Sequence, residues 1–286
     1  MNSRMRWRAG IITIMMCGVI AVFIGVSHAQ LVLYDDFAAP RIDPEKWRGT
    51  EGFSPSGNPN MEALRHIQNG QLRVLLNTSG ETYANSGSQS GRFGVEVRDG
   101  GAVTAMQAKV TVKNAVAEAC TANSSATSRA RAQLFGFFFN DGSSSGLGDG
   151  TGDISAGIQL QRDSKSGDQI IAFVNRCDDF GCTLVSSVTS SVTFTASWTI
   201  NQPVTLQIVW DSANHRFRFK AIPNTGAAEA KDISYAGLLP GTAPSRRVDD
   251  KRLVASNSVA NCVAGRREAS MEVLFDTVKL NAAAVP

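Results

Sequence analysis

Long polar side chains recur at alternate positions in three segments of the chain. They are Glu96 with Arg98, Arg129 with Arg131 and Gln133, and Gln159 with Gln161. Alternate residues of an extended strand point to the same face, so each segment would present carboxylate, guanidinium or amide groups on one side. Stacked across a curved sheet, these rows would bind a sugar or a similar hydroxyl-rich polymer. The alternative is a solvated outer face, which antiparallel sheets commonly have.

Aromatic side chains in loops would strengthen a carbohydrate interpretation, because sugar rings stack on exposed aromatic rings. Three aromatic residues lie in segments that read as loops: Tyr83, Phe180 and Tyr235. Three tryptophans lie in apolar strand contexts, where a core position is expected: Trp47, Trp198 and Trp210. The loop residues are therefore the better candidates for ligand contact.

A second kind of chemistry is suggested by the Gly- and Asp-rich segment 140–153. Asp141, Asp149 and Asp153 could supply the hard oxygen ligands that Ca²⁺ takes in six- to eight-fold coordination. EF-hand spacing is absent, and such segments are often plain turns. A structural calcium ion is the one cofactor that the sequence suggests.

The first 29 residues predict a secretory signal peptide. Arg4, Arg6 and Arg8 precede an apolar stretch over residues 11–26, and small residues before Gln30 fit a cleavage site. The apolar stretch is short for a membrane-spanning helix, which needs about 20 residues, and an uncleaved anchor is the alternative. We expect an exported protein, periplasmic or extracellular, with no membrane span in the mature chain.

Export changes how the charge is interpreted. The chain of 286 residues has 28 basic and 25 acidic side chains. The three arginines of the signal segment account for the surplus, since no acid precedes Asp35, and the chain from Gln30 onward is neutral. Proteins that follow nucleic-acid backbones concentrate Lys and Arg without matching acids. The balance argues against a nucleic-acid partner.

The cysteines read as disulfides. Removal of Cys17 with the signal leaves four, and disulfides form and persist in exported proteins. Cys177 and Cys182 flank a turn-like tetrapeptide, whereas Cys120 and Cys262 lie in similar small polar surroundings that fit a long-range link. Four cysteines allow three pairings. A zinc site is the alternative, but it favours two closely spaced pairs.

The rest of the chain predicts one all-β domain over residues 30–286. Short segments of alternating hydrophobicity are separated by turn residues, and no linker or fixed repeat divides them. In the clearest example, Phe217, Phe219 and Ala221 alternate with basic residues after the turn 211–214. This pattern indicates an antiparallel β-sandwich or barrel.

Three segments carry a resemblance to a known family. They are the opening segment (Leu33–Phe37 with Ile42–Trp47), Val273–Leu280 and the hairpin strand Leu206–Trp210. The resemblance is to strands of the concanavalin A-like lectin/glucanase superfamily. The resemblance implies a jelly-roll β-sandwich whose terminal strands lie side by side. It would bring Asp36 close to Asp276, which makes this pair a second candidate calcium site.

The catalytic motifs of that superfamily are not retained. Laminarinase-like glucanases carry Glu-x-Asp-x-Glu on one strand, and none of the nine glutamates begins such a run. Jelly-roll alginate lyases use Arg-x-Glu-x-Arg and Gln-x-His. Here Gly94 takes the place of the first arginine before Glu96 and Arg98, and Gln161 that of the histidine after Gln159.

The sequence therefore predicts an exported, non-catalytic jelly roll that binds a polysaccharide, a glycan or another envelope or extracellular component. Its ligand-binding residues would be Glu96, Arg98, Arg131, Gln133, Gln159 and Gln161. One alternative is a polysaccharide-cleaving enzyme, glucanase- or lyase-like, with a degenerate or unrecognised motif. Another is a structural or assembly module with no small ligand.

Overall fold

The structure, a computed structural model, describes residues 30–52, 60–123, 125–235, 237–238, 240–241, 247 and 249–285. The predicted signal peptide, with Cys17, lies outside the described residues. Within them, no helix is long and apolar enough to cross a membrane.

Sheet A has eight antiparallel strands in the order β14–β13–β12–β6–β16–β4–β3, with β1 paired to one end of β16. Its strands are β1 (Leu31–Asp35), β3 (Met61–Gln68), β4 (Gln71–Ser79), β6 (Ala105–Ala117), β12 (Pro203–Asp211), β13 (Arg216–Pro223), β14 (Glu229–Ser234) and β16 (Glu268–Asn281). The β1–β16 pairing confirms that the first and last strands lie side by side.

Sheet B also has eight antiparallel strands, in the order β10–β9–β8–β7–β15–β5–β2, with β11 paired to β9. Its strands are β2 (Trp47–Gly52), β5 (Ser88–Val97), β7 (Arg129–Asn140), β8 (Asp153–Asp163), β9 (Gly167–Cys177), β10 (Val185–Ser187), β11 (Val192–Thr193) and β15 (Lys251–Ala260). Three single 3₁₀ turns complete the described elements: η1 (Gly100–Ala102), η2 (Ser212–Asn214) and η3 (Ala282–Ala284).

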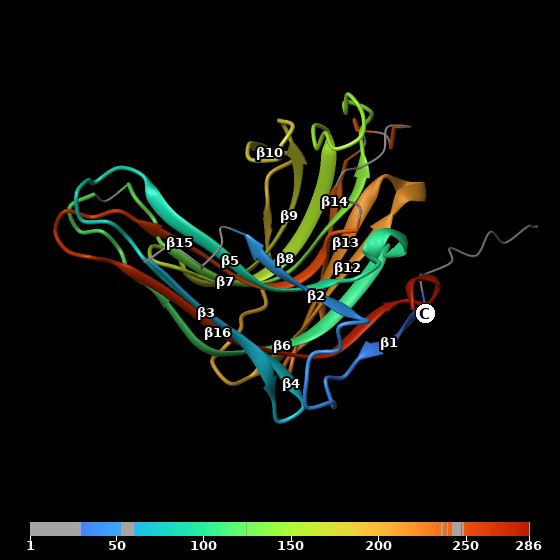
Figure 1. Ribbon diagram of the computed structural model, residues 1–286, viewed down its shortest axis with the longest axis horizontal. Helices are drawn as coiled ribbons and strands as arrows, with labels where there is room; N and C mark the ends of the chain where they lie inside the picture. Colours follow the sequence, from blue (N-terminus) through green and yellow to red (C-terminus); the bar gives the residue numbers. More distant parts are fainter. Residues whose placement is uncertain are drawn as a thin grey trace, which may run out of the picture.

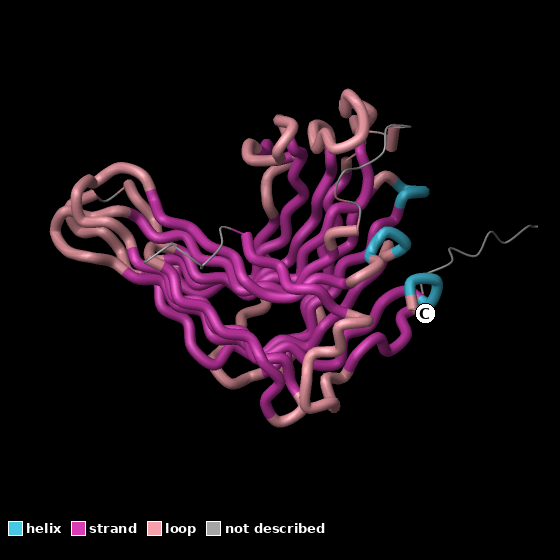
Figure 2. Tube along the Cα trace, in the orientation of Figure 1, coloured by secondary structure: helices cyan, strands magenta, loops and turns pink. Residues whose placement is uncertain are grey.

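The two sheets are layered into a sandwich, which confirms the predicted all-β jelly-roll class. Figure 1 shows β3, β4, β6 and β16 of sheet A below β5, β7 and β15 of sheet B, whereas β12, β13 and β14 of sheet A turn upward beside β8, β9 and β10 of sheet B. Loops gather at the ends of the strands, and helical turns are confined to short pieces (Figure 2). The last two strands of the chain lie inside the sheets, since β15 is between β7 and β5, and β16 is between β6 and β4.

Period-two patterning explains which faces meet in the core. In β4, Leu72, Val74 and Leu76 are fully buried, while the residues between them are more exposed. In β13, Phe217 and Phe219 are buried, and the alternating basic residues point outward as predicted. Apolar residues of both sheets form one continuous core. Burial of this surface provides the main stabilisation of the fold.

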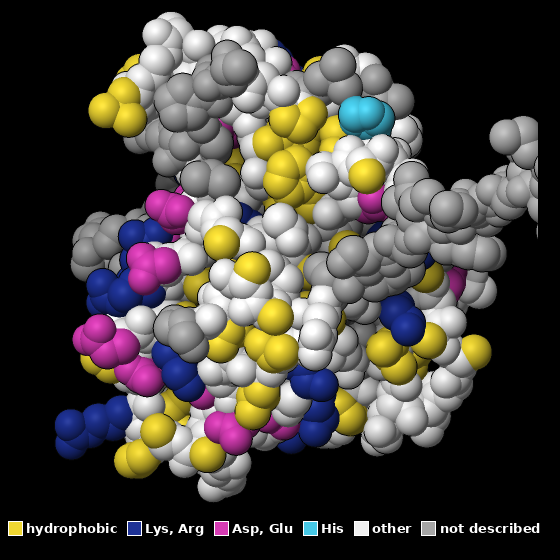
Figure 3. Space-filling model, turned by 90° about the vertical axis from the view of Figure 1, so that its right-hand side faces the viewer, with side chains coloured by type: hydrophobic (Ala, Val, Ile, Leu, Met, Phe, Trp, Pro, Cys, Tyr) yellow, Lys and Arg dark blue, Asp and Glu magenta, His cyan; other side chains and the backbone are white. Residues whose placement is uncertain are grey.

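Charges on the outer surface are mostly matched. Arg218 and Arg216 both pair with Asp232 across β13 and β14, and Arg73 pairs with Glu272 on sheet A. Basic and acidic side chains are interspersed on the face shown in Figure 3. This distribution agrees with the neutral balance that the sequence gives from Gln30 onward.

Both predicted disulfides are present. Cys177 and Cys182 close the tip after β9, with Cα atoms 4.8 Å apart. Cys120 and Cys262 link two loops 142 residues apart in sequence, with Cα atoms 5.5 Å apart. The second bond ties the loop after β6 in sheet A to the loop after β15 in sheet B, so it holds the two sheets together at one end.

Lys251 is a fully buried lysine at the start of β15. Its Nζ donates a hydrogen bond to the Gly100 carbonyl at 3.2 Å and lies 4.8 Å from the centre of the Phe138 ring. Gly136, its cross-strand partner, leaves room for it, because a Cβ there would come within 2.3 Å of the Lys251 Cδ. Burial lowers the pKa of Lys251 to about 7.

This shift makes stability depend on pH in a defined direction. Between pH 7 and the ordinary lysine value of 10.5 the unfolded chain binds a proton that the folded chain does not. The free energy of unfolding should therefore rise with pH across this interval, by on the order of a few kcal/mol. Lys251→Met should remove that rise, as measured by urea unfolding at several pH values. An unchanged pH profile in the variant would contradict the assignment.

Candidate binding groove

The face of sheet B that points away from sheet A carries a groove of about 760 Å³. Side chains from β5, β7, β8, β9 and β15 line it, together with residues in and beside β10 and β11. The opposite faces of β7 and β8 are filled by small and apolar core residues, such as Ala130, Ala132 and Leu160, as the sequence predicts. Period-two alternation therefore places polar residues of these strands in the groove.

Strand register aligns one polar row across five strands. Its members, in order from β5 to β9, are Arg92, Ser256, Arg131, Gln161 and Gln169. The small side chain of Ser256 stands between the two arginines, because it is the cross-strand partner of both. Neighbouring strands lie about 4.8 Å apart, so the backbones of the two arginines are about 10 Å apart.

The predicted residues on β7 and β8 form a chain of hydrogen bonds. Gln133 Nε2 donates to Gln159 Oε1 at 2.6 Å, and Gln159 Nε2 donates to Gln161 Oε1 at 2.8 Å. The Arg131 Nε donates to the same Gln161 oxygen at 3.1 Å. The structure thus brings together four of the six predicted ligand-binding residues, in fixed orientations.

Phenylalanines form an apolar floor beside this row. Phe135 and Phe137 of β7 meet edge to face with ring centres 5.3 Å apart, and Phe173 of β9 lies 6.2 Å from Phe135. Gly157, between them on β8, has no side chain to displace the Phe173 ring. The sequence did not predict which side of the sheet Phe135 and Phe137 point to, because residues 134–139 are almost all apolar and show no alternation.

Arg92 was missed by the sequence interpretation, although it continues the period-two pattern of Gly94 and Glu96 on β5. Its guanidinium lies 5.4 Å from the centre of the Phe135 ring, and its buried Nε has no hydrogen-bond partner. Burial, reinforced by Arg252 and Arg247, lowers the pKa of Arg92 to about 10. Burial likewise lowers the pKa of Arg131 to about 10, with Arg129 adding to the effect.

The other two arginines of the groove have partners. Arg129 Nε lies 2.8 Å from Asp163 Oδ2 in an ion pair across β7 and β8. Arg247 donates from Nη2 to the Gly181 carbonyl at 2.8 Å and lies over the Phe137 ring. Asp163 is the only acidic residue among the described residues of the groove lining.

Glu96 and Arg98 lie outside the groove, at the C-terminal end of β5. Glu96 is nearly buried and is held by Arg48 at 2.6 Å and Arg252 at 2.9 Å. Burial and the nearby Asp250 raise the pKa of Glu96, whereas the two arginines oppose this shift. Arg98 is exposed and donates from Nε to the Pro44 carbonyl at 2.7 Å. The structure does not bring these two predicted residues to the groove.

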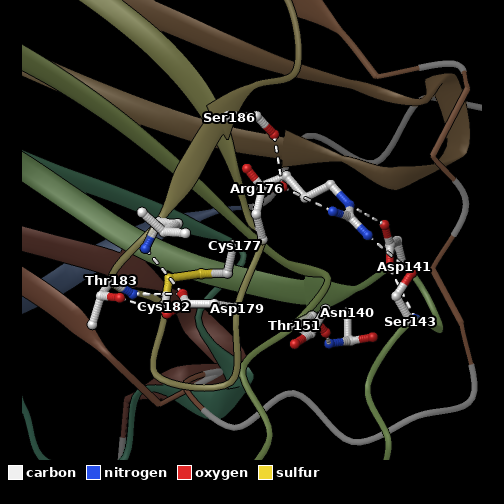
Figure 4. Close-up of polar contacts among 12 residues, drawn as sticks. Asn140, Asp141, Ser143, Thr151, Arg176, Cys177, Asp179, Cys182, Thr183 and Ser186 are labelled. Atoms are coloured by element: carbon white, nitrogen blue, oxygen red, sulfur yellow. Dashed lines mark hydrogen bonds and ion pairs between the residues drawn. A yellow bond between two sulfur atoms is a disulfide. The ribbon is translucent and has the colours of Figure 1, made fainter.

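Two loops meet at the upper end of sheet B (Figure 4). Arg176 joins them, since its guanidinium contacts Asp141 and Ser143 of the segment 140–153 and Asp178 of the tip closed by Cys177 and Cys182. The contacts with Asp141 and Asp178 are ion pairs of 2.6 and 2.9 Å. The tip therefore has a fixed position relative to the groove, whose lining includes Cys182.

The aspartates suggested for calcium take part in the folding of this loop. Asp149 accepts hydrogen bonds from the backbone of Ser145 and Thr151, and Asp153 accepts one from Asn140. The second candidate pair lies on sheet A, where Asp276 pairs with Lys109 and Asp36 is exposed. Both calcium sites remain predictions.

The loop aromatics divide into two groups. Tyr83 and Phe180 are exposed, at 77% and 60%, and Phe180 belongs to the tip at the end of the groove. The prediction for Tyr235 was wrong. It is buried and accepts a hydrogen bond from Trp210 Nε1 at 2.8 Å. Its ring packs against Phe139 and Phe217, so an apolar environment was available that the sequence around it does not show.

No family model matches the chain, and no curated protein matches it. Among solved structures, it is similar to a glycoside hydrolase family 16 endo-glucanase from Bacteroides ovatus, with 10% identity and a TM-score of 0.42 over 86% of this chain and 98% of that one. It is similar to an alginate lyase from Klebsiella pneumoniae, with 6% identity and a TM-score of 0.43 over 84% and 96% of the two chains.

A third similar structure is an immunostimulatory antigen and pseudo β-1,3-glucanase of Mycobacterium tuberculosis. The identity is 13% and the TM-score 0.42, over 88% of this chain and 98% of that one. Function has to be derived from the groove itself, since a shared fold does not fix it.

The floor of the groove offers a test of its packing. A Cβ on Gly157 would come within 2.4 Å of the far edge of the half-buried Phe173 ring, which would have to move, so Gly157→Ala should destabilise the protein by about 1 kcal/mol. With Phe173→Ala already present, most of this cost should vanish, because the obstructing ring is gone. Urea unfolding of the two single variants and the double variant measures the coupling. Additive effects would contradict this arrangement.

Proposed function

We propose that the protein is an exported, non-catalytic module that binds a carbohydrate chain in the groove of sheet B. The observation that carries this proposal is the hydrogen-bonded chain of Gln133, Gln159, Gln161 and Arg131. It holds amide and guanidinium groups in fixed positions on a concave surface. Ligand sites are typically concave and combine apolar walls with a few placed polar groups.

The hydrogen-bonded side chains of this row still have donors and acceptors available for a ligand. Gln133 Oε1, Gln161 Nε2 and the terminal nitrogens of Arg131 have no hydrogen-bond partner among the described residues. They offer an acceptor and several donors, which is what hydroxyl groups require because each can both donate and accept. The phenylalanine floor next to them suits the apolar C–H face of a sugar ring.

The acidic groups near the groove support binding rather than cleavage. Asp163 is paired with Arg129 and accepts hydrogen bonds from the backbone of Lys165 and Ser166. Glu96 is held between Arg48 and Arg252. Retaining glycosidases need two carboxyl groups about 5–5.5 Å apart facing the substrate, and the described lining of the groove offers a single carboxylate.

Export is supported by independent features. The segment 1–29 has the composition of a signal peptide, and the remaining cysteines form two disulfides, which is typical of oxidising compartments.

Substitution of the central glutamines tests the proposal. Gln159→Ala and Gln161→Ala should each weaken glycan binding by about tenfold, since each removes hydrogen bonds worth about 1–1.5 kcal/mol. Binding is measured on a glycan array and then by calorimetry with the best ligand. Gln207→Ala is the matched control, because Gln207 is a partly exposed strand residue on sheet A. It should leave binding unchanged.

Two results would contradict the proposal. The first is an array on which the wild-type protein binds no glycan. The second is the release of new reducing ends, or of 4,5-unsaturated products, from polysaccharides incubated with the protein. That second result would favour the enzyme alternative.

A further inference from the structure

We propose that the groove selects glycans that carry carboxylate or sulfate groups, and that Arg92 and Arg131 bind these anionic groups. This inference rests on the proposed carbohydrate function and adds the chemical class of the ligand.

The first support is that neither arginine forms an ion pair with a described residue. The side chain of Arg92 makes no ion pair or hydrogen bond with any described residue, and its Nε is buried. Arg131 donates a hydrogen bond only to the neutral Gln161, and the nearby acid Asp163 is already paired with Arg129. Elsewhere on the strands, arginines are paired with acids, as in Arg73 with Glu272, Arg162 with Asp168 and Arg218 with Asp232.

The second support is the local charge of the groove. Its described lining includes Arg92, Arg129, Arg131 and Arg247 against the single acid Asp163. Asp163 is already engaged by Arg129. The groove is therefore positive although the chain from Gln30 onward is neutral. Low-dielectric walls such as the Phe135 floor strengthen the field of these charges in the cleft.

The third support is geometric. Arg92 and Arg131 point to the same face from strands separated by β15, and the β15 residue between them is the small Ser256. This arrangement leaves space between the two side chains. A guanidinium is a planar fork that binds carboxylate or sulfate oxygens through two parallel hydrogen bonds. Arg92 lies over Phe135 and Arg131 contacts Gln161, so the two guanidiniums can bind neighbouring anionic groups of one carbohydrate chain.

The energetics favour a ligand over a purely structural role. A desolvated cation without a partner destabilises the folded state, and like-charge repulsion between neighbouring arginines adds to this cost, as the lowered pKa values of both groups indicate. An anion that enters the groove would remove both costs. We therefore expect Arg92 to weaken the stability of the free protein and to strengthen binding.

The experiment compares matched pairs of polymers that differ only in charge. One pair is polygalacturonate and its carboxyl-reduced form, and the other is dextran sulfate and dextran. Affinity electrophoresis and calorimetry at two salt concentrations should show at least tenfold tighter binding of the charged member. Binding should weaken as salt rises. The two pairs distinguish a carboxylate from a sulfate ligand.

Single substitutions locate the effect. Arg92→Gln and Arg131→Gln should each reduce binding of the charged polymer at least tenfold and leave binding of the neutral polymer nearly unchanged. Arg218→Gln on sheet A, which removes a matched charge outside the groove, should have little effect. Arg92→Gln should also leave the midpoint of thermal unfolding unchanged or raise it. A structural role for Arg92 predicts a lowered midpoint instead.

The outcomes separate this inference from the proposed function. Equal or tighter binding of the neutral polymers would overturn the anionic preference and leave carbohydrate binding standing. Binding of none of the four polymers, together with an empty glycan array, would overturn both. Tighter binding of single-stranded DNA than of any glycan would also overturn both, because it would assign the arginine pair to phosphates. Loss of charged-polymer binding equally in Arg218→Gln would show that overall charge, not the pair, is responsible.

Discussion

The structure depends on the register of β7 and β8 in the middle of sheet B. Each strand carries small or apolar residues on the core side, such as Ala132 and Leu160, and polar residues on the groove side, such as Gln133 and Gln161. A slip of one residue would exchange the two faces completely. It would bury the amide chain in the core and expose the apolar set. The same register therefore packs the sandwich and builds the groove.

Local pattern was enough to predict this part from sequence. Alternation fixed the facing of Arg131, Gln133, Gln159 and Gln161, and turn residues fixed the hairpin of β12 and β13. Alternation predicts which face of the sheet a residue is on, but it does not predict whether the residue lies at the groove or farther along the strand. Glu96 has the correct face, but it sits where Arg48 and Arg252 converge on it. This convergence depends on the order of the strands, because Arg48 and Arg252 lie 48 and 156 residues from Glu96 in the sequence.

Overall charge was also an incomplete guide. A neutral chain can hold a positive groove if the balancing acids lie elsewhere, and the described lining of this groove has four arginines against one acid. Arg92 escaped notice because glycine follows it at the next position of the pattern, so the strand seemed to begin at Gly94. The groove positions of Phe135 and Phe173 were not predicted, because an uninterrupted apolar segment has no alternation from which a face could be assigned.

The placement of β15 and β16 has a consequence for the time course of folding. Each is an interior strand of its sheet, yet both lie near the end of the chain. Before they are synthesised, β5 and β7 have no common neighbour, and neither have β4 and β6. Unpaired strand edges of this kind promote aggregation, and pairing between distant segments is slow. Neither sheet can therefore be complete before β15 and β16 have been synthesised, and assembly of the groove must follow their synthesis.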